Sequence, residues 1–261
     1  TFFKEMRKER RLKYFRTILM TVLFAVSMLV YVVFNSGSPL NSAASSDTYR
    51  TIRANEDVPP SKDAKFAAIA VVPIRGTIDG DILGENPSPN LVARVRSVLK
   101  AIEAEKNKNL TTLVLYVDSP GGTATASDEI YRMVLEWKKK NKVRVVAYFH
   151  SVAASGGYYV AQASDEIIAD ETAFTGSIGV IMSALNFAEL ARKFGVTSET
   201  IKSGEFKDLG SPFRVMTPSE RQILQDLVNE SYEKFLSVVA AGRKGRLTKD
   251  EIRKLADGRI W

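Results

Sequence analysis

From residue 66 onward, short apolar runs alternate with amphipathic stretches, and this alternation restricts the fold more than any other feature of the chain. Apolar runs at 66–74 and 112–117 flank a stretch at 91–105 that has the spacing of an amphipathic helix. Strand-like runs that alternate with helical periods are typical of β-α-β units around a parallel sheet. The sequence therefore predicts an α/β domain over residues 66–261.

The same alternation continues towards the end of the chain. Helices are expected at 126–139, 156–163, 187–194, 218–242 and 248–256. Strands are expected at 143–149, 166–169, 178–182 and 197–201. With 261 residues, 45% of them apolar, the chain can bury one substantial core.

The first 34 residues differ from this domain. Residues 1–16 carry seven Lys or Arg side chains against two Glu side chains. Residues 17–34 contain no charge, glycine or proline, and as a helix they would be about 27 Å long, close to the hydrocarbon thickness of a bilayer. A cleaved signal sequence has a shorter apolar core of about 7 to 15 residues, so we predict a retained transmembrane helix. The basic flank predicts a cytoplasmic N-terminus in the inner or plasma membrane, with all later residues periplasmic or extracellular.

The excess of basic residues is local. The formal net charge of +7 arises from 37 Lys and Arg against 30 Asp and Glu. Outside residues 1–16, 30 basic and 28 acidic residues remain, so the domain is nearly neutral and nucleic acid is not an expected partner. Residues 35–65 are rich in Ser, Ala, Asn, Asp and Pro without apolar periodicity, which predicts a flexible linker.

A serine and a lysine in two glycine-containing loops are the catalytic candidates. Ser155 lies in S-V-A-A-S-G-G-Y-Y, and Lys207 follows 52 positions later in K-S-G-E-F-K-D-L-G-S-P-F-R. The chain has no cysteine and one histidine, so a cysteine nucleophile is excluded and a histidine base would have to be His150. His150 ends an apolar strand, and no third group for a histidine-centred triad is evident.

A lysine can act as the base only where water is excluded. Its ordinary pKa near 10.4 keeps it protonated at neutral pH, and burial in an apolar pocket lowers that pKa by about 3 to 5 units. Most loop lysines are solvated charges instead. Pro212 and Phe213 beside Lys207 make it a better candidate than Lys202.

Three further residues have plausible supporting roles, each with a structural alternative. Gly122 in D-S-P-G-G and Gly156 after the serine could donate N–H groups to an oxyanion, although a Pro-Gly turn is commonly only a turn. Ser177 in T-G-S-I-G could orient the lysine amine or simply shape a turn. Ser155 itself could serve as a helix N-cap, and Ser151 is a rival nucleophile that lacks the following glycines.

Together, the motifs D-S-P-G-G, S-V-A-A-S-G-G-Y-Y, T-G-S-I-G-V and S-G-x-x-K-x-x-G-S-P-F-R resemble, in this order, the signal peptide peptidase A family of membrane-anchored serine proteases. The resemblance covers residues 66–261. It implies a Clp protease/crotonase-like fold of repeated β-β-α units. It also implies that Ser155 is the nucleophile, Lys207 the general base, Gly122 and Gly156 the oxyanion donors, and Ser177 the partner of the lysine.

The resemblance further implies an assembly. Members of the family form rings, here a homo-oligomer of about eight modules, and the serine and lysine can come from different protomers. Since both motifs occur in one copy of the domain, the chain resembles the short, single-domain type. Relatives continue beyond the segment that matches D-G-R-I-W, where this chain stops.

The expected function is therefore that of a membrane-tethered Ser-Lys endopeptidase that degrades remnant signal peptides and other small or unfolded hydrophobic chains. No metal, nucleotide or other cofactor is implied. Two alternatives remain at this stage: a crotonase-like enzyme acting on acyl thioesters, and a catalytically silent membrane scaffold.

Overall fold

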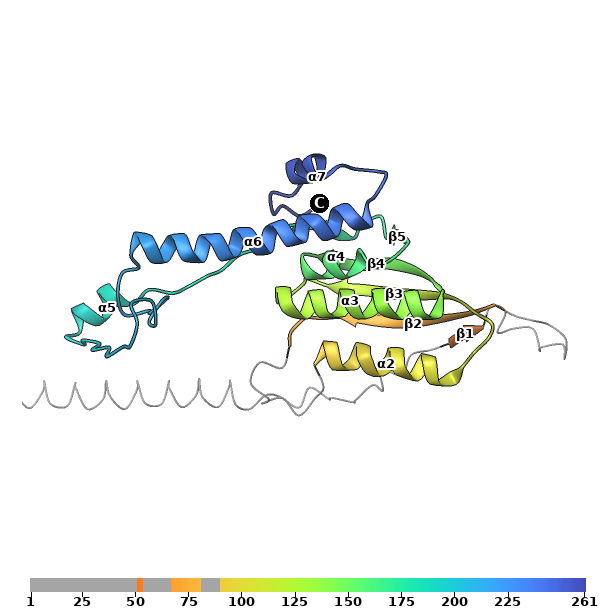
Figure 1. The fold of residues 1–261 in the computed structure, drawn as a ribbon, viewed down its shortest axis with the longest axis horizontal. Coiled ribbons are helices and arrows are strands. Elements are labelled where there is room, and N and C mark those ends of the chain that lie inside the picture. The colour runs from red at the N-terminus through yellow and green to blue at the C-terminus, as the bar shows by residue number, and fades with distance from the viewer. Residues whose placement is uncertain (1–50, 54–66, 81–89) are drawn as a thin grey trace, which may run out of the picture. The chain divides into compact units, whose positions relative to one another are not determined.

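The computed structural model describes residues 51–53, 67–80 and 90–261 (Figure 1). The chain divides into two compact units, Thr1–Thr48 and Tyr49–Trp261, and every described residue belongs to the second. The predicted basic segment 1–16 and transmembrane helix 17–34 lie outside the described residues, as does most of the predicted linker. In the part of the chain that is described, no helix is both long enough and apolar enough to cross a membrane.

A mostly parallel sheet confirms the predicted α/β class. Its strands lie in the order β1-β2-β3-β4-β5, with β6 paired to β4. The parallel strands are β2 (Ala68–Arg75), β3 (Leu110–Ser119), β4 (Arg144–Ala154), β5 (Glu166–Ala169) and β6 (Phe174–Gly176). The short β1 (Thr51–Arg53) pairs antiparallel with β2 and falls within the segment predicted as linker.

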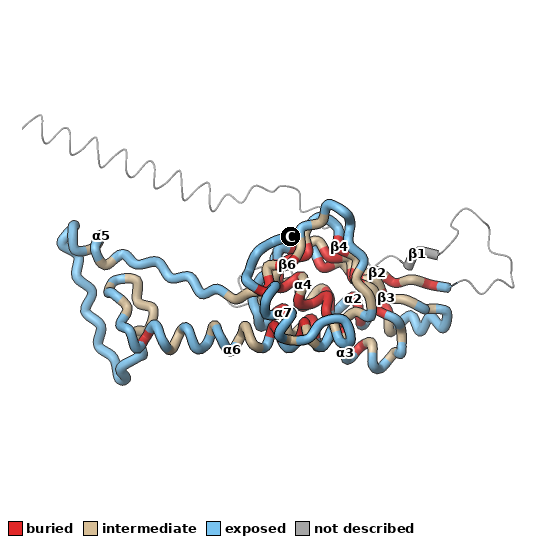
Figure 2. Tube along the Cα trace, turned by 90° about the horizontal axis from the view of Figure 1, so that it is seen from above, coloured by how far each residue is buried: buried red, intermediate tan, exposed pale blue. Residues whose placement is uncertain are grey.

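Three helices cover one face of this sheet: α2 (Leu91–Glu105), α3 (Ala124–Asn141) and α4 (Gly156–Ala161) (Figure 1). Alternate strand residues are buried beneath them, and Val72, Leu115 and Ala147 are neighbours across the three central strands with no exposed surface. Val114, Tyr116 and Tyr148, on the opposite face, are only half-buried. The core therefore lies between the sheet and these helices, as the buried segments in Figure 2 show.

Beyond the main sheet, the strands continue into a second, shorter row of pairings. The register of β3 against β4 shifts after Val117, so that Ser119 lies beside Ala153. Next to this pair, Ile78 bridges to Gly122, and the end of β4 pairs with β6. This second row consists of the pair Ser119–Ala153, the bridge Ile78–Gly122 and the pairing of β4 with β6. The segments that contain Ser155, Gly122 and Ser177 lie in or next to this second row, whereas the segment of Lys207 does not.

The chain leaves the domain after β6 and returns along a long helix. Residues 181–217, here called the arm, include α5 (Ala188–Lys193), none of whose residues is buried. The helix α6 (Pro218–Gly242) begins at the arm with a capping box made by Thr217, and its buried apolar residues lie in its C-terminal half. The final helix α7 (Lys249–Leu255) packs on α6, where the Tyr232 hydroxyl donates to the Ala256 carbonyl at 2.7 Å.

Two predicted strands are wrong. Residues 178–182 and 197–201 form no strand in the structure. A strand needs a neighbour to pair its backbone groups, and among the described residues no strand lies beside either segment. The apolar side chains that suggested strands, among them Ile181 and Ile201, are exposed on the arm instead.

Candidate active site

Ser155 lies at the sharp turn between β4 and α4 and has an unusual backbone conformation. Its φ of 50° and ψ of −118° place a non-glycine residue in a sparsely populated region. Such a conformation costs about 1 to 3 kcal/mol and is most common at functional sites. The serine occupies the N-cap position of α4, yet its side chain makes no capping hydrogen bond. The hydroxyl is therefore presented by a strained strand-to-helix turn and is not used as a cap.

Backbone hydrogen bonds and close packing hold this turn in place. The Ser155 N–H donates to the Gly176 carbonyl at 2.9 Å, and the Ser155 carbonyl accepts from the Tyr159 N–H at 2.9 Å. A Cβ on Gly156 would lie 2.3 Å from the Ser127 hydroxyl oxygen, and one on Gly157 would lie 2.9 Å from the Ser119 carbonyl oxygen. The close approach of α4 to the end of β3 therefore requires Gly157, and Gly156 leaves room for the Ser127 side chain of α3.

The turn that contains Gly122 lies directly beside the turn of Ser155. Ile78 donates its N–H to the Gly121 carbonyl and accepts from the Thr123 N–H, both at 2.8 Å. Because these two bonds flank Gly122 on one side, its own N–H points away from Ile78. A Cβ built on Gly156 would be 3.1 Å from the Gly122 nitrogen, so the two backbone N–H groups are close together.

These two N–H groups are free to bind an oxyanion. Among the described residues, neither the Gly122 N–H nor the Gly156 N–H donates a hydrogen bond. Two adjacent, fixed N–H donors at the start of a helix are the arrangement that stabilises a developing negative charge next to a nucleophile.

Ser177 is brought to the same place from the next segment. It follows Gly176, whose carbonyl accepts the Ser155 N–H, and it also has a positive φ, of 49°. Its N–H donates to the Arg259 carbonyl at 2.7 Å, and Thr175 exchanges two hydrogen bonds of 3.0 Å with Trp261. Residues 259–261 thus pair with the β6 segment and hold it beside Ser155. No local pattern in D-G-R-I-W predicts this pairing.

Lys207 lies elsewhere, exposed within the arm. The neighbouring Asp208 accepts from Lys202 Nζ at 2.7 Å and from Arg214 Nε at 2.8 Å. Arg214 also forms a bidentate ion pair with Glu220, a buried residue in the first turn of α6. The lysine loop is therefore anchored to the N-terminal end of α6.

Ser155 lies near the opposite end of α6. The ring of Tyr159, four residues after the serine, packs 5.0 Å from that of Phe235, and Arg243 donates to the Tyr158 hydroxyl at 3.0 Å. From Glu220 to Phe235 the helix rises by about 22 Å. Figures 1 and 2 show α5 and the arm at one end of α6 and α4 at the other. Within one chain, the structure brings together Ser155, Gly156, Gly122 and Ser177 but not Lys207.

Charge pairing ties the stability of the arm to pH. Hydrogen bonds from the Arg214 guanidinium, and then from the Thr217 N–H, lower the pKa of Glu220 from 4.5 to about 2. Hydrogen bonds from Arg214, and then from Lys202, lower the pKa of Asp208 below its ordinary range. A carboxyl group whose pKa is lower in the folded state stabilises it fully above its ordinary pKa and loses this effect as the pH falls. For Glu220 this loss extends from pH 4.5 to about pH 2.

We expect Arg214→Ala to release the lysine loop at neutral pH. Hydrogen exchange of amides 202–217 should become about tenfold faster, while that of the central strands is unchanged. In the wild type, limited digestion by pepsin should cut the arm increasingly as the pH falls from 4.5 towards 2. Arg192→Ala is a matched control, because Arg192 forms its ion pair with the exposed Glu189 on α5 and not with the lysine loop. Equal exchange in the two variants would show that the ion pairs do not hold the loop.

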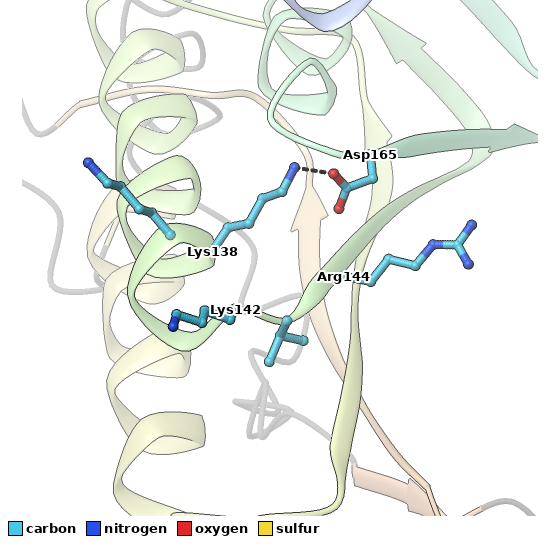
Figure 3. A pocket seen from close by; sticks show the side chains of 6 residues that line it. Lys138, Lys142, Arg144 and Asp165 are labelled. Atoms are coloured by element: carbon cyan, nitrogen blue, oxygen red, sulfur yellow. Dashed lines mark ion pairs between the residues drawn. The ribbon is translucent and has the colours of Figure 1, made fainter.

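A hollow of about 530 Å³ lies at the N-terminal end of β4. It is lined mainly by cationic side chains, and Lys138 Nζ pairs with Asp165 at 2.5 Å (Figure 3). Arg144 starts β4, whereas Ser155 follows the end of β4. The hollow is therefore separate from the candidate active site.

Comparison with known proteins identifies two family profiles. The profile of peptidase family S49 matches residues 137–261, and that of Clp protease matches residues 82–169. A solved structure of a ClpP1 mutant from Listeria monocytogenes gives a TM-score of 0.45 at 16% identity, covering 73% of this chain and 80% of that chain. The fold assignment rests on the sheet topology and not on this superposition.

Several curated proteins are similar in sequence. A protein of Synechocystis sp. named as a protease is 42% identical over 64% of this chain and 58% of its own length. An Enterococcus faecium protein named as signal peptide peptidase SppA is 41% identical over 60% of this chain and 45% of its own length. Protease 4 of Haemophilus influenzae is 34% identical over 74% of this chain and 30% of its own length. The chain thus spans between about a third and about three fifths of these relatives.

Proposed function

Because the chain belongs to peptidase family S49, whose profile covers the segment with both candidate catalytic residues, we propose that it is a serine endopeptidase with Ser155 as nucleophile and Lys207 as general base. The observation that carries this proposal is the strained turn at Ser155 beside two unused N–H donors. A helix N-cap would use the serine hydroxyl, and a simple Pro-Gly turn would not need the Gly122 N–H to face Gly156.

The proposed reaction is acyl transfer in two stages. The Ser155 oxygen bonds to the carbonyl carbon of the peptide while its proton passes to Lys207 Nζ, and the carbonyl electrons form an oxyanion held by the Gly122 and Gly156 N–H groups. The C–N bond then breaks, and the proton on the lysine passes to the departing amine. In the second stage, water attacks the carbonyl carbon of the ester and gives a proton to the lysine. The C–O bond to Ser155 then breaks, and the proton on the lysine passes to the Ser155 oxygen, which releases the acid and the free serine. We propose that the Ser177 hydroxyl forms a hydrogen bond with Lys207 Nζ and so keeps the lysine amine oriented.

We further propose that Lys207 serves the Ser155 of a neighbouring copy. The two residues lie near opposite ends of α6, and Lys207 is exposed. Apolar side chains of the arm are also exposed and would need a protein partner. Those more than half exposed include Ile181, Leu185, Phe194, Val196, Ile201 and Val215. Seating the arm on another copy would bury both the apolar surface and the lysine, which favours the neutral amine.

The setting of this enzyme is also a proposal. We infer a ring of about eight copies, each tethered by a transmembrane helix at residues 17–34 with the protease domain outside the cytoplasm. Remnant signal peptides and other small hydrophobic chains are the proposed substrates, because they are released at the membrane surface beside such a ring. The names of the E. faecium and H. influenzae relatives support this substrate class and a protease activity.

Replacement of the nucleophile tests the reaction directly. Ser155→Ala should reduce hydrolysis of a hydrophobic signal-peptide substrate by at least about four orders of magnitude, and it should abolish labelling by a serine-directed phosphonate. Ser151→Ala, four residues earlier and exposed, is the matched control and should keep near wild-type activity. Wild-type protein that cleaves a coenzyme A thioester but no peptide would overturn the proposal, as would activity that follows Ser151.

A further inference from the structure

We propose that Ser119 is a positioning residue that fixes the oxyanion turn. This inference rests on the proposed function and adds a residue to it. Ser119 precedes Pro120 in the D-S-P-G-G segment. The sequence pattern of this segment predicts a role for its glycines and none for Ser119. Its side chain has no exposed surface, so it cannot contact a substrate from solvent. Any effect on catalysis would therefore act through the backbone that it holds.

The Ser119 hydroxyl joins two turns. It donates to the Gly76 carbonyl at 2.6 Å and accepts from the Gly121 N–H at 3.1 Å. Gly76 and Gly121 have φ values of 77° and 100°, so both turns use conformations that only glycine adopts freely. One buried hydroxyl thus satisfies a donor and an acceptor in two segments that would otherwise have more conformational freedom.

The same residue also contacts the helix of the nucleophile. A Cβ on Gly157 would lie 2.9 Å from the Ser119 carbonyl oxygen and 3.4 Å from its Cβ. A Cβ on Gly121 would lie 2.6 Å from the Gly156 nitrogen and 2.8 Å from the Ser155 Cβ. Ser119 is therefore where the end of β2, the oxyanion turn and the start of α4 meet.

Loss of the hydroxyl should change the direction of one oxyanion donor. The Gly122 N–H belongs to the peptide unit that follows Gly121, and rotation about Gly121 moves it. Without Ser119 Oγ, the Gly121 N–H and the Gly76 carbonyl lose this partner inside the protein. Gly121 is buried, and a buried donor without a partner favours a shifted turn. A donor displaced from the oxyanion weakens transition-state binding more than substrate binding.

We expect Ser119→Ala to lower kcat by about 10- to 100-fold with KM changed less than about twofold. The affinity for a peptide aldehyde, which forms a tetrahedral adduct with the serine, should fall in parallel with kcat. The affinity of the same peptide in an uncleavable form should be unchanged. Ser164→Ala is the matched control, because Ser164 also donates to a backbone carbonyl at 2.6 Å, at the far end of α4. It should leave kcat and aldehyde affinity as in the wild type.

The activity of each variant is divided by the amount of Ser155 that a phosphonate labels when the labelling is complete. A variant with a smaller folded fraction is then not mistaken for one with a lower kcat. Ser119→Cys, which keeps a weak donor at the same position, should give an intermediate kcat and serves if the alanine variant does not fold. If the wild type is active and the Ser119 variants have the same kcat and aldehyde affinity as Ser164→Ala, the role of Ser119 is overturned and the proposed function is not. A wild type that neither cleaves the peptide nor binds the aldehyde would overturn the proposed function itself.

Discussion

An equimolar mixture of Ser155→Ala and Lys207→Ala chains should recover about a quarter of wild-type peptidase activity, although each variant alone should be nearly inactive. The physical reason is the position of the two residues. Ser155 lies beside the C-terminal half of α6, through Tyr159 and Phe235, while the loop of Lys207 is anchored to Glu220 in the first turn of this helix. A site that takes its serine from one copy and its lysine from the next can be rebuilt from two defective chains.

The expected fraction follows from random assembly. Half of the sites in the mixture carry Ser155, all of them on Lys207→Ala chains. Half of the neighbours of those chains carry an intact lysine, which gives about one complete site in four. The chains must be mixed under conditions that allow subunits to exchange, or be co-expressed. The readout is hydrolysis of the signal-peptide substrate, measured beside each variant alone.

A lysine in the same arm provides the matched control. Lys193 is exposed at the end of α5, and Lys193→Ala should remain as active as the wild type. Inactive mixtures of chains that do co-assemble would show that the serine and lysine act within one chain. That result would also require the arm to fold back along α6 by about 22 Å. Near wild-type activity of Lys207→Ala alone would instead remove Lys207 from the mechanism.

Gly122→Ala should be the most damaging single methyl addition in the domain. Its Cβ would lie 1.9 Å from the Ile78 carbonyl oxygen and 2.5 Å from the carbonyl carbon. Both are backbone atoms within a paired segment, so the turn must move as a whole. We expect kcat/KM to fall by about 100- to 1000-fold, the effect of losing one oxyanion donor, together with a lower melting temperature from the overpacked turn.

Substitutions of two other glycines provide comparisons for Gly122→Ala. Gly156→Ala should be milder, because the nearest atom to its new Cβ is the side-chain oxygen of Ser127, at 2.3 Å, which can rotate away. Gly80→Ala, whose Cβ would have no described atom within 4 Å, should leave activity and melting temperature unchanged. Kinetics and thermal melts of the three variants test the order. Equal activity of Gly122→Ala and Gly80→Ala would contradict the oxyanion role of this turn.

Much of this molecule could be predicted from local sequence pattern. The alternation of apolar runs and helical periods predicted the parallel α/β sheet. For α6, a cap at Thr217 or Ser219 and Gly242 at the end predicted the full length of the helix, and the structure has the cap at Thr217. These features depend on side-chain periodicity and capping, which act over a few residues. Glycines after a serine at a strand-to-helix boundary likewise indicated the turn that the structure contains at Ser155.

Local pattern failed where the structure depends on neighbours. The apolar segments at 178–182 and 197–201 have strand-like composition but lie without strand partners among the described residues. In contrast, residues 259–261 have no strong strand pattern and nevertheless pair with β6 beside the site. Hydrogen-bond partners distant in sequence decided both cases, and periodicity carries no information about them.

By itself, then, the sequence determined the class of fold and the kinds of group available for catalysis, because these follow from residue type, periodicity and the absence of cysteine. Only the tertiary structure decided which groups meet. It places the Gly122 and Gly156 N–H groups and Ser177 around Ser155, assigns Ser119 to the buried junction between them, and leaves Lys207 near the other end of α6. These contacts join residues between 21 positions apart, as for Ser155 and Gly176, and 43 positions apart, as for Ser119 and Gly76. Packing of the sheet against its helices sets their distances, not any local preference of the chain.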